Sequence, residues 1–441
     1  MKVAVIGTGY VGTVTATCLA WVGHDVRGFD VDETRASQLA AGQVPFFEPG
    51  LAELLAETTT SGRLTFSSDP GEALSGAAII FLCVGTPPGP GGLPDMSQFE
   101  GAAAAVAPYL RDGSIVVNKS TVPVGSGNWV RTMLEEALPR HAAPRFYVVS
   151  NPEFLREGAA IEDFLYPDRV VLGGENGAPD VVAQLYRPIL EQSFPGAQMD
   201  LRPQLITTDV HSAEMIKYAA NAFLATKISF ANEIASICEL VGADVRQVLP
   251  AIGADARIGP RFLQPGIGWG GSCFGKDVAA LSATALEYGY NASILRATVE
   301  VNQAMRSAVT RKLQAELKTL KGRRIAILGL SFKPGTDDLR DAPSLDIARR
   351  LLAAGALISA YDPIVKELPD DLTSVRVATD PYDAVDRTEA VVLVTEWEEI
   401  VELDMGKLCE SMSGNLVIDG RNCVDPEHAR EAGIHLVGIG W

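Results

Sequence analysis

The chain has 441 residues, of which 47% are hydrophobic, and its formal net charge is −18. This length and hydrophobic content allow two or three domains, each with a buried core. The acidic balance, without any cluster of lysine and arginine, argues against a nucleic-acid partner. The apolar start at residues 3–6 is too short for a signal peptide or a membrane span, so we expect a cytoplasmic protein.

The cysteines and histidines exclude two further classes of protein. Six cysteines lie far apart without a Cys-x-x-Cys pair, and five histidines are scattered along the chain. This pattern favours reduced thiols over a disulfide framework and offers no spacing for a metal site. We therefore expect no metal.

The first third of the chain has the pattern of a dinucleotide-binding unit. A predicted strand at 2–6 leads into Gly7, Gly9 and Gly12, a helical pattern to residue 21, and a second strand at 25–29 that ends at Asp30. In this motif the three glycines allow the turn, the approach of the backbone to the pyrophosphate, and close helix–strand packing. Asp30 is placed to hold ribose hydroxyls and to repel a 2′-phosphate, which favours NAD over NADP. Arg35 either lies along the same ligand or is a solvated arginine on a helix face.

Three more strands are predicted at 77–84, 115–119 and 146–150, with helices at 98–110 and 126–138 between them. Ligands bind at the carboxyl ends of the strands in such a doubly wound sheet. The loops at 85–87, 120–123 and 151–157 should therefore surround the nicotinamide. Thr121, Glu153 and Glu157 are site candidates, and the alternative is turn chemistry for Thr121 and solvated acids for the glutamates. The two glutamates share a helix face if Pro152 begins a turn.

A helix is predicted at 211–241, where no glycine or proline interrupts an alanine-rich segment. Steps of three and four residues place Lys217 and Asn221 in line with an apolar stripe that continues through Leu224, Ile228, Ala231 and Ala235. A partly buried lysine needs an anionic partner or a chemical task. We interpret Lys217 and Asn221 as oxyanion donors; the alternative is that Lys217 extends to solvent.

The most informative segment is 266–277, where four glycines in six positions, at 266, 268, 270 and 271, precede Cys273 and Asp277. Glycines of this density allow a main chain to approach a ligand. A helix predicted at 277–286 would place the thiol at its positive end, where the nucleophilic thiolate is favoured. The alternative is a buried cysteine without a chemical role.

The last third repeats the α/β pattern. Strands are predicted at 323–330, 357–361, 390–395 and 416–419, with a helix at 344–354. The first of these strands lacks the G-x-G-x-x-G spacing after it, so we expect no second dinucleotide. Lys333, Arg340 and Arg421 lie at or beyond strand ends, where they would meet phosphate or act as ordinary surface cations.

Taken together, these segments resemble the UDP-glucose/GDP-mannose dehydrogenase family over almost the whole chain. The matching stretches are the N-terminal glycines and residues 120–125, 151–158, 214–221, 257–259 and 270–277. The resemblance implies two Rossmann-like doubly wound domains joined by a central helical domain with one long helix. The NAD-binding domain would span residues 1–205, the central helical domain residues 206–310, and the UDP-sugar-binding domain residues 311–441.

The same resemblance implies an activity. Members oxidise the C6 alcohol of a nucleotide sugar to a carboxylate with two equivalents of NAD. The segment 257–259 favours UDP-glucose over GDP-mannose, and Ser272 stands where the UDP-N-acetylmannosamine branch usually has histidine. Cys273 would attack the aldehyde, with Lys217 and Asn221 at the oxyanion. Thr121 and Asp277 would hold a water, and Asp277 or Glu153 would activate the water of hydrolysis.

The resemblance also implies binding residues and an assembly. The NAD contacts would be Gly7, Gly9, Tyr10, Val11, Gly12, Asp30, Arg35, Gly85, Thr86, Pro87, Thr121, Glu157, Lys276 and Arg340. The substrate contacts would be Glu153, Phe154, Leu155, Arg156, Lys217, Asn221, Arg257, Phe262, Leu263, Gly266, Gly268, Gly270, Phe332, Lys333 and Arg421. A homodimer would form through the long helix, with Arg257 reaching the neighbouring subunit. Gly275, where many relatives have proline, and Trp269, where phenylalanine is common, depart from the family pattern.

Two functions of other kinds remain open from the sequence alone. A two-electron NAD-linked alcohol or hydroxyacid dehydrogenase would use the same α/β parts and would not need Cys273. A nucleotide sensor would bind without turnover, and it would have no use for Cys273, Lys217 and Asp277 together.

Overall fold

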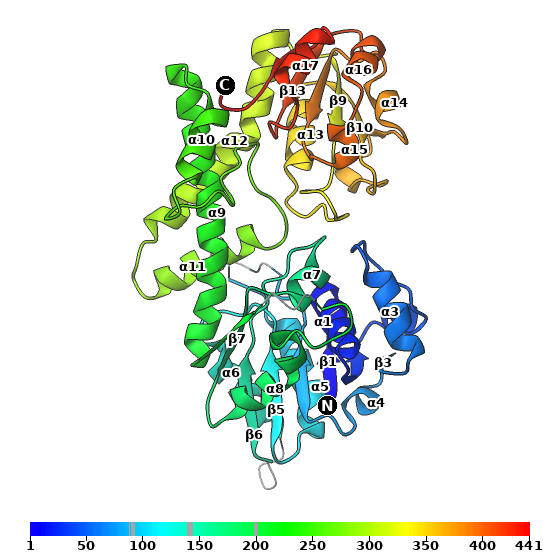
Figure 1. The fold of residues 1–441 in the computed structure, drawn as a ribbon, viewed down its shortest axis with the longest axis vertical. Helices are drawn as coiled ribbons and strands as arrows, with labels where there is room; N and C mark the ends of the chain where they lie inside the picture. Colours follow the sequence, from blue (N-terminus) through cyan, green and yellow to red (C-terminus); the bar gives the residue numbers. More distant parts are fainter. Residues whose placement is uncertain (88, 90–92, 139–143, 198–201) are drawn as a thin grey trace. The chain divides into compact units, whose positions relative to one another are not determined.

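The computed structural model describes all residues except 88, 90–92, 139–143 and 198–201. The chain forms two compact units, the first comprising residues 1–220 and 279–288 and the second residues 221–278 and 289–441. In each unit, helices cover both faces of a sheet (Figure 1). Within the described part of the chain, no helix has the length and apolar character needed to cross a membrane.

The first unit contains an eight-stranded sheet in the order β3-β2-β1-β4-β5-β6-β7-β8. Its strands are β1 (Lys2–Ile6), β2 (Asp25–Phe29), β3 (Leu64–Ser67), β4 (Ile79–Leu82), β5 (Ser114–Asn118), β6 (Phe146–Ser150), β7 (Arg169–Gly174) and β8 (Gln204–Thr208). Its helices are α1 (Tyr10–Trp21), α2 (Glu33–Ala40), α3 (Leu51–Thr60), α4 (Pro70–Leu74), α5 (Ser97–Val106), α6 (Ser126–Ala137), α7 (Ala160–Leu165) and α8 (Ala178–Leu190). All neighbouring strands are parallel except the antiparallel pair β6 and β7.

The strands of this sheet are apolar on both faces, as a sheet covered by helices on each side requires. In β1, Val3 and Val5 belong to one core and Ala4 and Ile6 to the other. The predicted strands at 2–6, 25–29 and 146–150 match β1, β2 and β6. Strands β3, β7 and β8 were missing from the prediction; β8, for example, is largely exposed and offers no apolar run.

The second unit contains a six-stranded, wholly parallel sheet in the order β11-β10-β9-β12-β13-β14. Its strands are β9 (Arg324–Leu328), β10 (Leu357–Tyr361), β11 (Arg376–Val377), β12 (Ala390–Leu393), β13 (Leu416–Asp419) and β14 (His435–Val437). Its helices are α10 (Val245–Gly253), α12 (Ser293–Leu317), α13 (Pro343–Ala353), α14 (Pro381–Val385), α15 (Glu398–Val401), α16 (Met405–Ser411) and α17 (Pro426–Glu431). The first five strands repeat the order of β3-β2-β1-β4-β5, so the expected pair of Rossmann-like sheets is confirmed.

Two helices contain a boundary between the units, since residues 220 and 221 lie in one and residues 278 and 279 in the other. Helix α9 (Val210–Val241) matches the long helix predicted at 211–241. Helix α11 (Phe274–Glu287) begins three residues before the predicted start at 277. The Asp277 N–H donates to the Cys273 carbonyl over 2.9 Å, so Cys273 lies directly at the helix start.

Lys119, just after β5, is a charge inside the core of the first unit. Only 4% of it is exposed. Its ammonium donates to Asn151 Oδ1 over 3.2 Å and to the Tyr186 hydroxyl over 3.4 Å, and it lies 5.5 Å from the centre of the Phe164 ring. Burial disfavours the charged form and lowers the pKa of Lys119 to about 8.

The lowered pKa of Lys119 predicts a specific dependence of stability on pH. Between about pH 8 and pH 10, Lys119 keeps its proton in the unfolded chain but has released it in the folded chain. The free energy of unfolding of the wild type therefore rises with pH over this range. Lys119→Met should therefore be more stable than wild type below pH 8, by up to about 3 kcal/mol, and the gain should shrink towards pH 10. Urea unfolding from pH 6.5 to 10 measures this gain, with the exposed Lys2→Met as control; a gain independent of pH contradicts the assignment.

Candidate active site

The glycines after β1 form the turn into α1. A Cβ on Gly12 would lie 1.8 Å from the Gly7 carbonyl oxygen, and one on Gly7 would lie 2.8 Å from Val84. Around the Cβ position of Gly9, by contrast, no atom of the described chain lies within 4 Å. Packing within the chain thus explains Gly7 and Gly12, while Gly9 leaves a space beside the helix start.

Asp30, which follows β2, is 6% exposed and tied to the same turn. Its Oδ2 accepts from the Thr8 N–H over 2.8 Å and the Thr8 hydroxyl over 3.0 Å, and it pairs with Arg35 over 3.2 Å. Its Oδ1 accepts from the Asp32 N–H over 3.0 Å. Arg35 therefore lies against Asp30, the carboxylate that is predicted to bind the ribose, and the Arg35 side chain is 39% exposed.

These residues fit a dinucleotide. Helix α1 starts at Tyr10 after Gly9 without a side-chain cap, which leaves its first N–H groups for phosphate oxygens. The space beside Gly9 admits the pyrophosphate, and a carboxylate has about four acceptor positions, so Asp30 can also accept from a ribose hydroxyl. NAD bound here would be held by the turn and by Asp30.

Tyr10, a predicted NAD contact, forms a hydrogen bond within the chain. Its hydroxyl donates to the buried Glu48, which also accepts from the N–H groups of Gly158 over 2.6 Å and Ala160 over 2.8 Å. Burial and the Glu48 carboxylate raise the pKa of Tyr10 far above its ordinary value. Glu48, which no sequence motif singled out, anchors the loop after β6 to the start of α1.

The loops after β4 and β5 meet at the carboxyl edge of the sheet, as predicted. The Thr86 hydroxyl donates to the Thr121 carbonyl over 2.7 Å, and the Ser120 hydroxyl donates to the Val84 carbonyl over 2.8 Å. Gly85 and Pro87 are exposed beside them. Val11 and Thr121 are half-buried.

Glu153 and Lys217 form a buried ion pair in the first unit, with Lys217 Nζ 2.7 Å from Glu153 Oε1. They are 8% and 4% exposed. Burial by itself raises the pKa of Glu153, but the Lys217 charge and hydrogen bond, and the Leu155 N–H at 2.7 Å, outweigh this and hold it below its ordinary value. The expected anionic partner of Lys217 is therefore Glu153.

The expectation of a helix face shared by Glu153 and Glu157 was wrong. Residues 151–156 have no helical structure, and α7 begins only at Ala160. Pro152 does not start a helix because the N–H of Leu155 bonds to the Glu153 side chain instead. Two predicted substrate contacts in this loop also have partners in the chain: the Phe154 ring lies 5.6 Å from Lys217 Nζ, and Arg156 pairs with Asp163 over 2.6 Å.

The second unit carries the thiol and the carboxylate predicted to assist it. Asp277 is 1% exposed and accepts from Asn221 Nδ2 over 2.6 Å and from Lys276 Nζ over 2.8 Å. Cys273, one turn earlier, is half-buried, with its sulfur 3.6 Å from the Ser272 hydroxyl. Asn221 and Lys276 thus hold the Asp277 carboxylate one turn from the thiol.

Packing accounts for the glycines before Cys273, a reason that the sequence pattern did not supply. A Cβ would lie 2.8 Å from the Gly420 oxygen at Gly266, 2.6 Å from Asn302 Oδ1 at Gly268, 2.5 Å from the Asp341 oxygen at Gly270, and 2.7 Å from the Phe332 ring at Gly271. Any side chain at these positions would separate the segment from the rest of the second unit. We call residues 266–271 the glycine segment.

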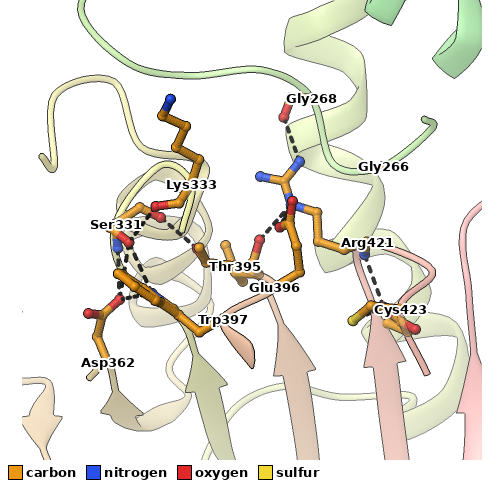
Figure 2. Close-up of polar contacts among 12 residues, drawn as sticks. Gly266, Gly268, Ser331, Lys333, Asp362, Thr395, Glu396, Trp397, Arg421 and Cys423 are labelled. Carbon is orange, nitrogen blue, oxygen red and sulfur yellow. Dashed lines mark hydrogen bonds and ion pairs between the residues drawn. The ribbon is translucent and has the colours of Figure 1, made fainter. Parts of the chain in front are cut away.

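Arg421 joins the glycine segment to the second sheet. Its Nη1 donates to the Gly268 carbonyl over 3.2 Å and its Nε to the Val394 carbonyl over 2.7 Å, while Glu396 lies 3.3 Å from Nε (Figure 2). Lys333 extends over the Phe332 ring, 5.5 Å from its centre. Lys333 and Arg421, the two cations predicted to bind phosphate, thus follow β9 and β13 at the carboxyl edge of the sheet.

Asp362, at the end of β10, corresponds in position to Asp30 and differs in its surroundings. Its Oδ2 accepts from the N–H groups of Leu330 and Ser331 and from the indole of Trp397, and its Oδ1 accepts from the N–H groups after it (Figure 2). Asp362 is fully buried. With its acceptor positions taken by the chain, it cannot hold a ribose, which supports the expectation of no second dinucleotide.

The remaining predicted residues lie on loops of the second unit. Arg257 is 89% exposed and pairs with Asp255 over 2.6 Å. Arg340 pairs with Asp338 over 2.8 Å, and its carbonyl accepts from the Gly271 N–H over 3.1 Å. Phe262 has a φ of 64°, and Leu263 is buried.

Comparison with known proteins identifies the family. Three family models match: the NAD binding domain of the UDP-glucose/GDP-mannose dehydrogenase family at residues 1–190, its central domain at 211–304, and its UDP binding domain at 326–426. The chain belongs to the UDP-glucose/GDP-mannose dehydrogenase family. The NAD binding domain contains the β1–α1 turn, and the central domain contains Cys273.

Full-length relatives support this assignment. The chain is 44% identical to UDP-glucose 6-dehydrogenase of Rhizobium meliloti, covering 100% of this chain and 99% of the relative, and 42% identical to UDP-glucose 6-dehydrogenase TuaD of Bacillus subtilis, covering 100% and 93%. A UDP-glucose dehydrogenase structure from Pyrobaculum islandicum matches with a TM-score of 0.89 and 38% identity, covering 100% of this chain and 98% of that one. The chain is therefore an NAD-dependent oxidoreductase of this family.

The packing around Gly270, in the glycine segment, and around Gly275, on α11, predicts contrasting effects of two alanine substitutions. Gly270→Ala forces Cβ against the Asp341 carbonyl and should cost about 1–3 kcal/mol and slow NADH formation at least about tenfold. At Gly275, the nearest atoms would lie 3.6 Å and 3.7 Å from Cβ, so Gly275→Ala on α11 should be neutral or stabilising by up to about 1 kcal/mol. Melting curves and activity assays measure both; equal effects would contradict the packing explanation.

Proposed function

We propose that this protein oxidises the C6 alcohol of UDP-glucose to the carboxylate of UDP-glucuronate with two equivalents of NAD. The observation that carries the proposal is the nucleophile arrangement: Cys273 at the start of α11, one turn before a buried Asp277 that Asn221 and Lys276 hold. A carboxylate and a thiol in this relation suit formation and hydrolysis of a thioester.

The choice of UDP-glucose rests on the relatives and on one residue. Relatives named UDP-glucose 6-dehydrogenase are 35–44% identical to this chain, whereas a UDP-D-ManNAc dehydrogenase structure from Pyrococcus horikoshii is 27% identical with a TM-score of 0.86. A GDP-mannose dehydrogenase structure from Pseudomonas aeruginosa is 30% identical, with a TM-score of 0.54. Ser272, where the N-acetylmannosamine branch usually has histidine, agrees with the first group.

The first oxidation makes an aldehyde. A water held by Thr121 and Asp277 takes the proton of the C6 hydroxyl as C6 loses a hydride. Bound NAD supplies the hydride acceptor for this oxidation and the next, one equivalent each. Lys333 and Arg421 hold the diphosphate, and their charge is needed because the chain carries a net charge of −18.

The second oxidation and hydrolysis use the thiol. The Cys273 thiolate forms a C–S bond to the aldehyde carbon, and Lys217 and Asn221 donate to the oxyanion that results. Loss of the second hydride from C6 turns this thiohemiacetal into a thioester. Water then adds to the thioester carbon while Asp277 accepts its proton, with Glu153 as a second candidate base. The C–S bond breaks, the carboxylate leaves, and the thiolate is restored.

We also propose a homodimer through α9. Phe223, Phe230 and Ile237 recur every seven residues on this helix and are 64%, 47% and 47% exposed. Exposed apolar side chains in one stripe suit a contact with a second copy of the chain. Arg257, 89% exposed, would then reach the site of the neighbouring subunit.

The stoichiometry of NADH formation tests the proposal. Wild type should form two NADH for each UDP-glucose consumed and little or none from GDP-mannose or UDP-N-acetylmannosamine. Cys273→Ser should lower uronate formation at least about 1,000-fold, because a hydroxyl at this position is far less nucleophilic than a thiolate, while NAD affinity stays unchanged. Cys409→Ser is the control. One NADH per sugar would indicate a two-electron dehydrogenase, no NADH a sensor, and full uronate formation by Cys273→Ser would exclude the thioester.

A further inference from the structure

Asn302 on α12 binds both main-chain polar groups of one residue in the glycine segment, Trp269. Its Oδ1 accepts from the Trp269 N–H over 2.7 Å, and its Nδ2 donates to the Trp269 carbonyl over 3.0 Å. Asn302 is 2% exposed. Two hydrogen bonds from one planar amide restrain the two peptide groups that flank Trp269, as a residue in a neighbouring antiparallel strand would.

The neighbours of Asn302 fit this pairing. At Gly268 the φ is 98° and a Cβ would lie 2.6 Å from Asn302 Oδ1, so glycine is required there for two separate reasons. Arg306, one turn along α12, donates from Nη2 to the same Trp269 carbonyl over 2.9 Å and from Nη1 to Asp341 over 2.6 Å. The main chain at Trp269 is thus held from one helix by an amide and a guanidinium.

The Trp269 side chain carries this constraint to the thiol. Its indole N–H donates to the Ser229 hydroxyl over 3.1 Å, and its ring packs edge-on against Phe274 with the ring centres 6.1 Å apart. Phe274 is the first residue of α11 and the direct neighbour of Cys273. A continuous line of contacts thus leads from Asn302 through Trp269 to Phe274, at the start of the helix that presents Cys273.

We propose that Asn302 is a positioning residue for Cys273, setting the place of the thiol through the main chain and ring of Trp269 and the ring of Phe274. This role rests on the proposed function, in which Cys273 attacks the sugar aldehyde. The first oxidation does not involve the thiol, whereas the second begins with C–S bond formation. Displacement of Cys273 should therefore slow the second oxidation selectively, and a misplacement of about 1 Å costs roughly 100-fold in rate.

The test compares Asn302→Leu, which keeps the approximate volume and removes both hydrogen bonds, with Thr310→Val on the same helix as the matched control. In Asn302→Leu we expect kcat to fall roughly 10- to 100-fold, the NADH yield to drop from two towards one per UDP-glucose consumed, and the KM for NAD to stay within about twofold. Alkylation of Cys273 by iodoacetamide at pH 7, followed by mass spectrometry of its peptide, should slow at least about threefold as the thiol leaves the helix start. Thr310→Val should match wild type in each measurement.

A second variant covers the case in which Asn302→Leu does not fold. Asn302→Asp keeps the acceptor for the Trp269 N–H and loses the donor to the Trp269 carbonyl. Its kcat, NADH yield and alkylation rate should therefore lie between those of wild type and those expected for Asn302→Leu. Unchanged NADH yield and unchanged alkylation in a folded variant would overturn the positioning role. If wild type itself forms no NADH from UDP-glucose, the proposed function fails, and the alkylation rates alone then decide on Asn302.

Discussion

The close packing of the glycine segment against its own unit is the constraint on which the candidate site depends. Main chain at residues 266–271 meets main chain and rings directly, since a Cβ at four of these positions would lie within 2.8 Å of another atom. Hydrogen bonds from Gly266 to Asn232, from Trp269 to Asn302 and from Gly271 to the Arg340 carbonyl complete the attachment. Cys273 lies two residues after this segment, so the fold of the second unit restrains its position.

Each unit holds a buried polar pair that involves a residue of α9. In the first, the buried pair of Lys217 and Glu153 keeps the carboxylate ionised. In the second, Asn221 holds Asp277. Lys217 and Asn221 stand one turn apart on α9, so a single helix supplies a donor to each pair. Preorganised donors of this kind require little rearrangement when charge develops on a substrate, which is how such groups lower a reaction barrier.

Sequence patterns predicted the parts of the fold that depend on local signals. The strand, glycine and helix order around Gly7 and the uninterrupted helix at 211–241 are confirmed, because each has a clear periodicity or punctuation. Strand β8 was missed since its side chains are largely exposed, and the helical expectation for Glu153 and Glu157 failed since the Glu153 side chain bonds to backbone. Asn302 was missed altogether, because its partner at Trp269 is distant in sequence.

Hydrogen exchange of the unliganded protein tests most directly whether the glycine segment is fixed before substrate binds. The amides of Gly266, Ile267, Trp269 and Gly271 all donate to chain acceptors. We predict that these amides exchange as slowly as those of α9, without UDP-sugar or NAD present. Exchange of the segment at the rate of an exposed loop, slowed only after ligand is added, would contradict the account, since the thiol would then be placed by the substrate and not by the fold.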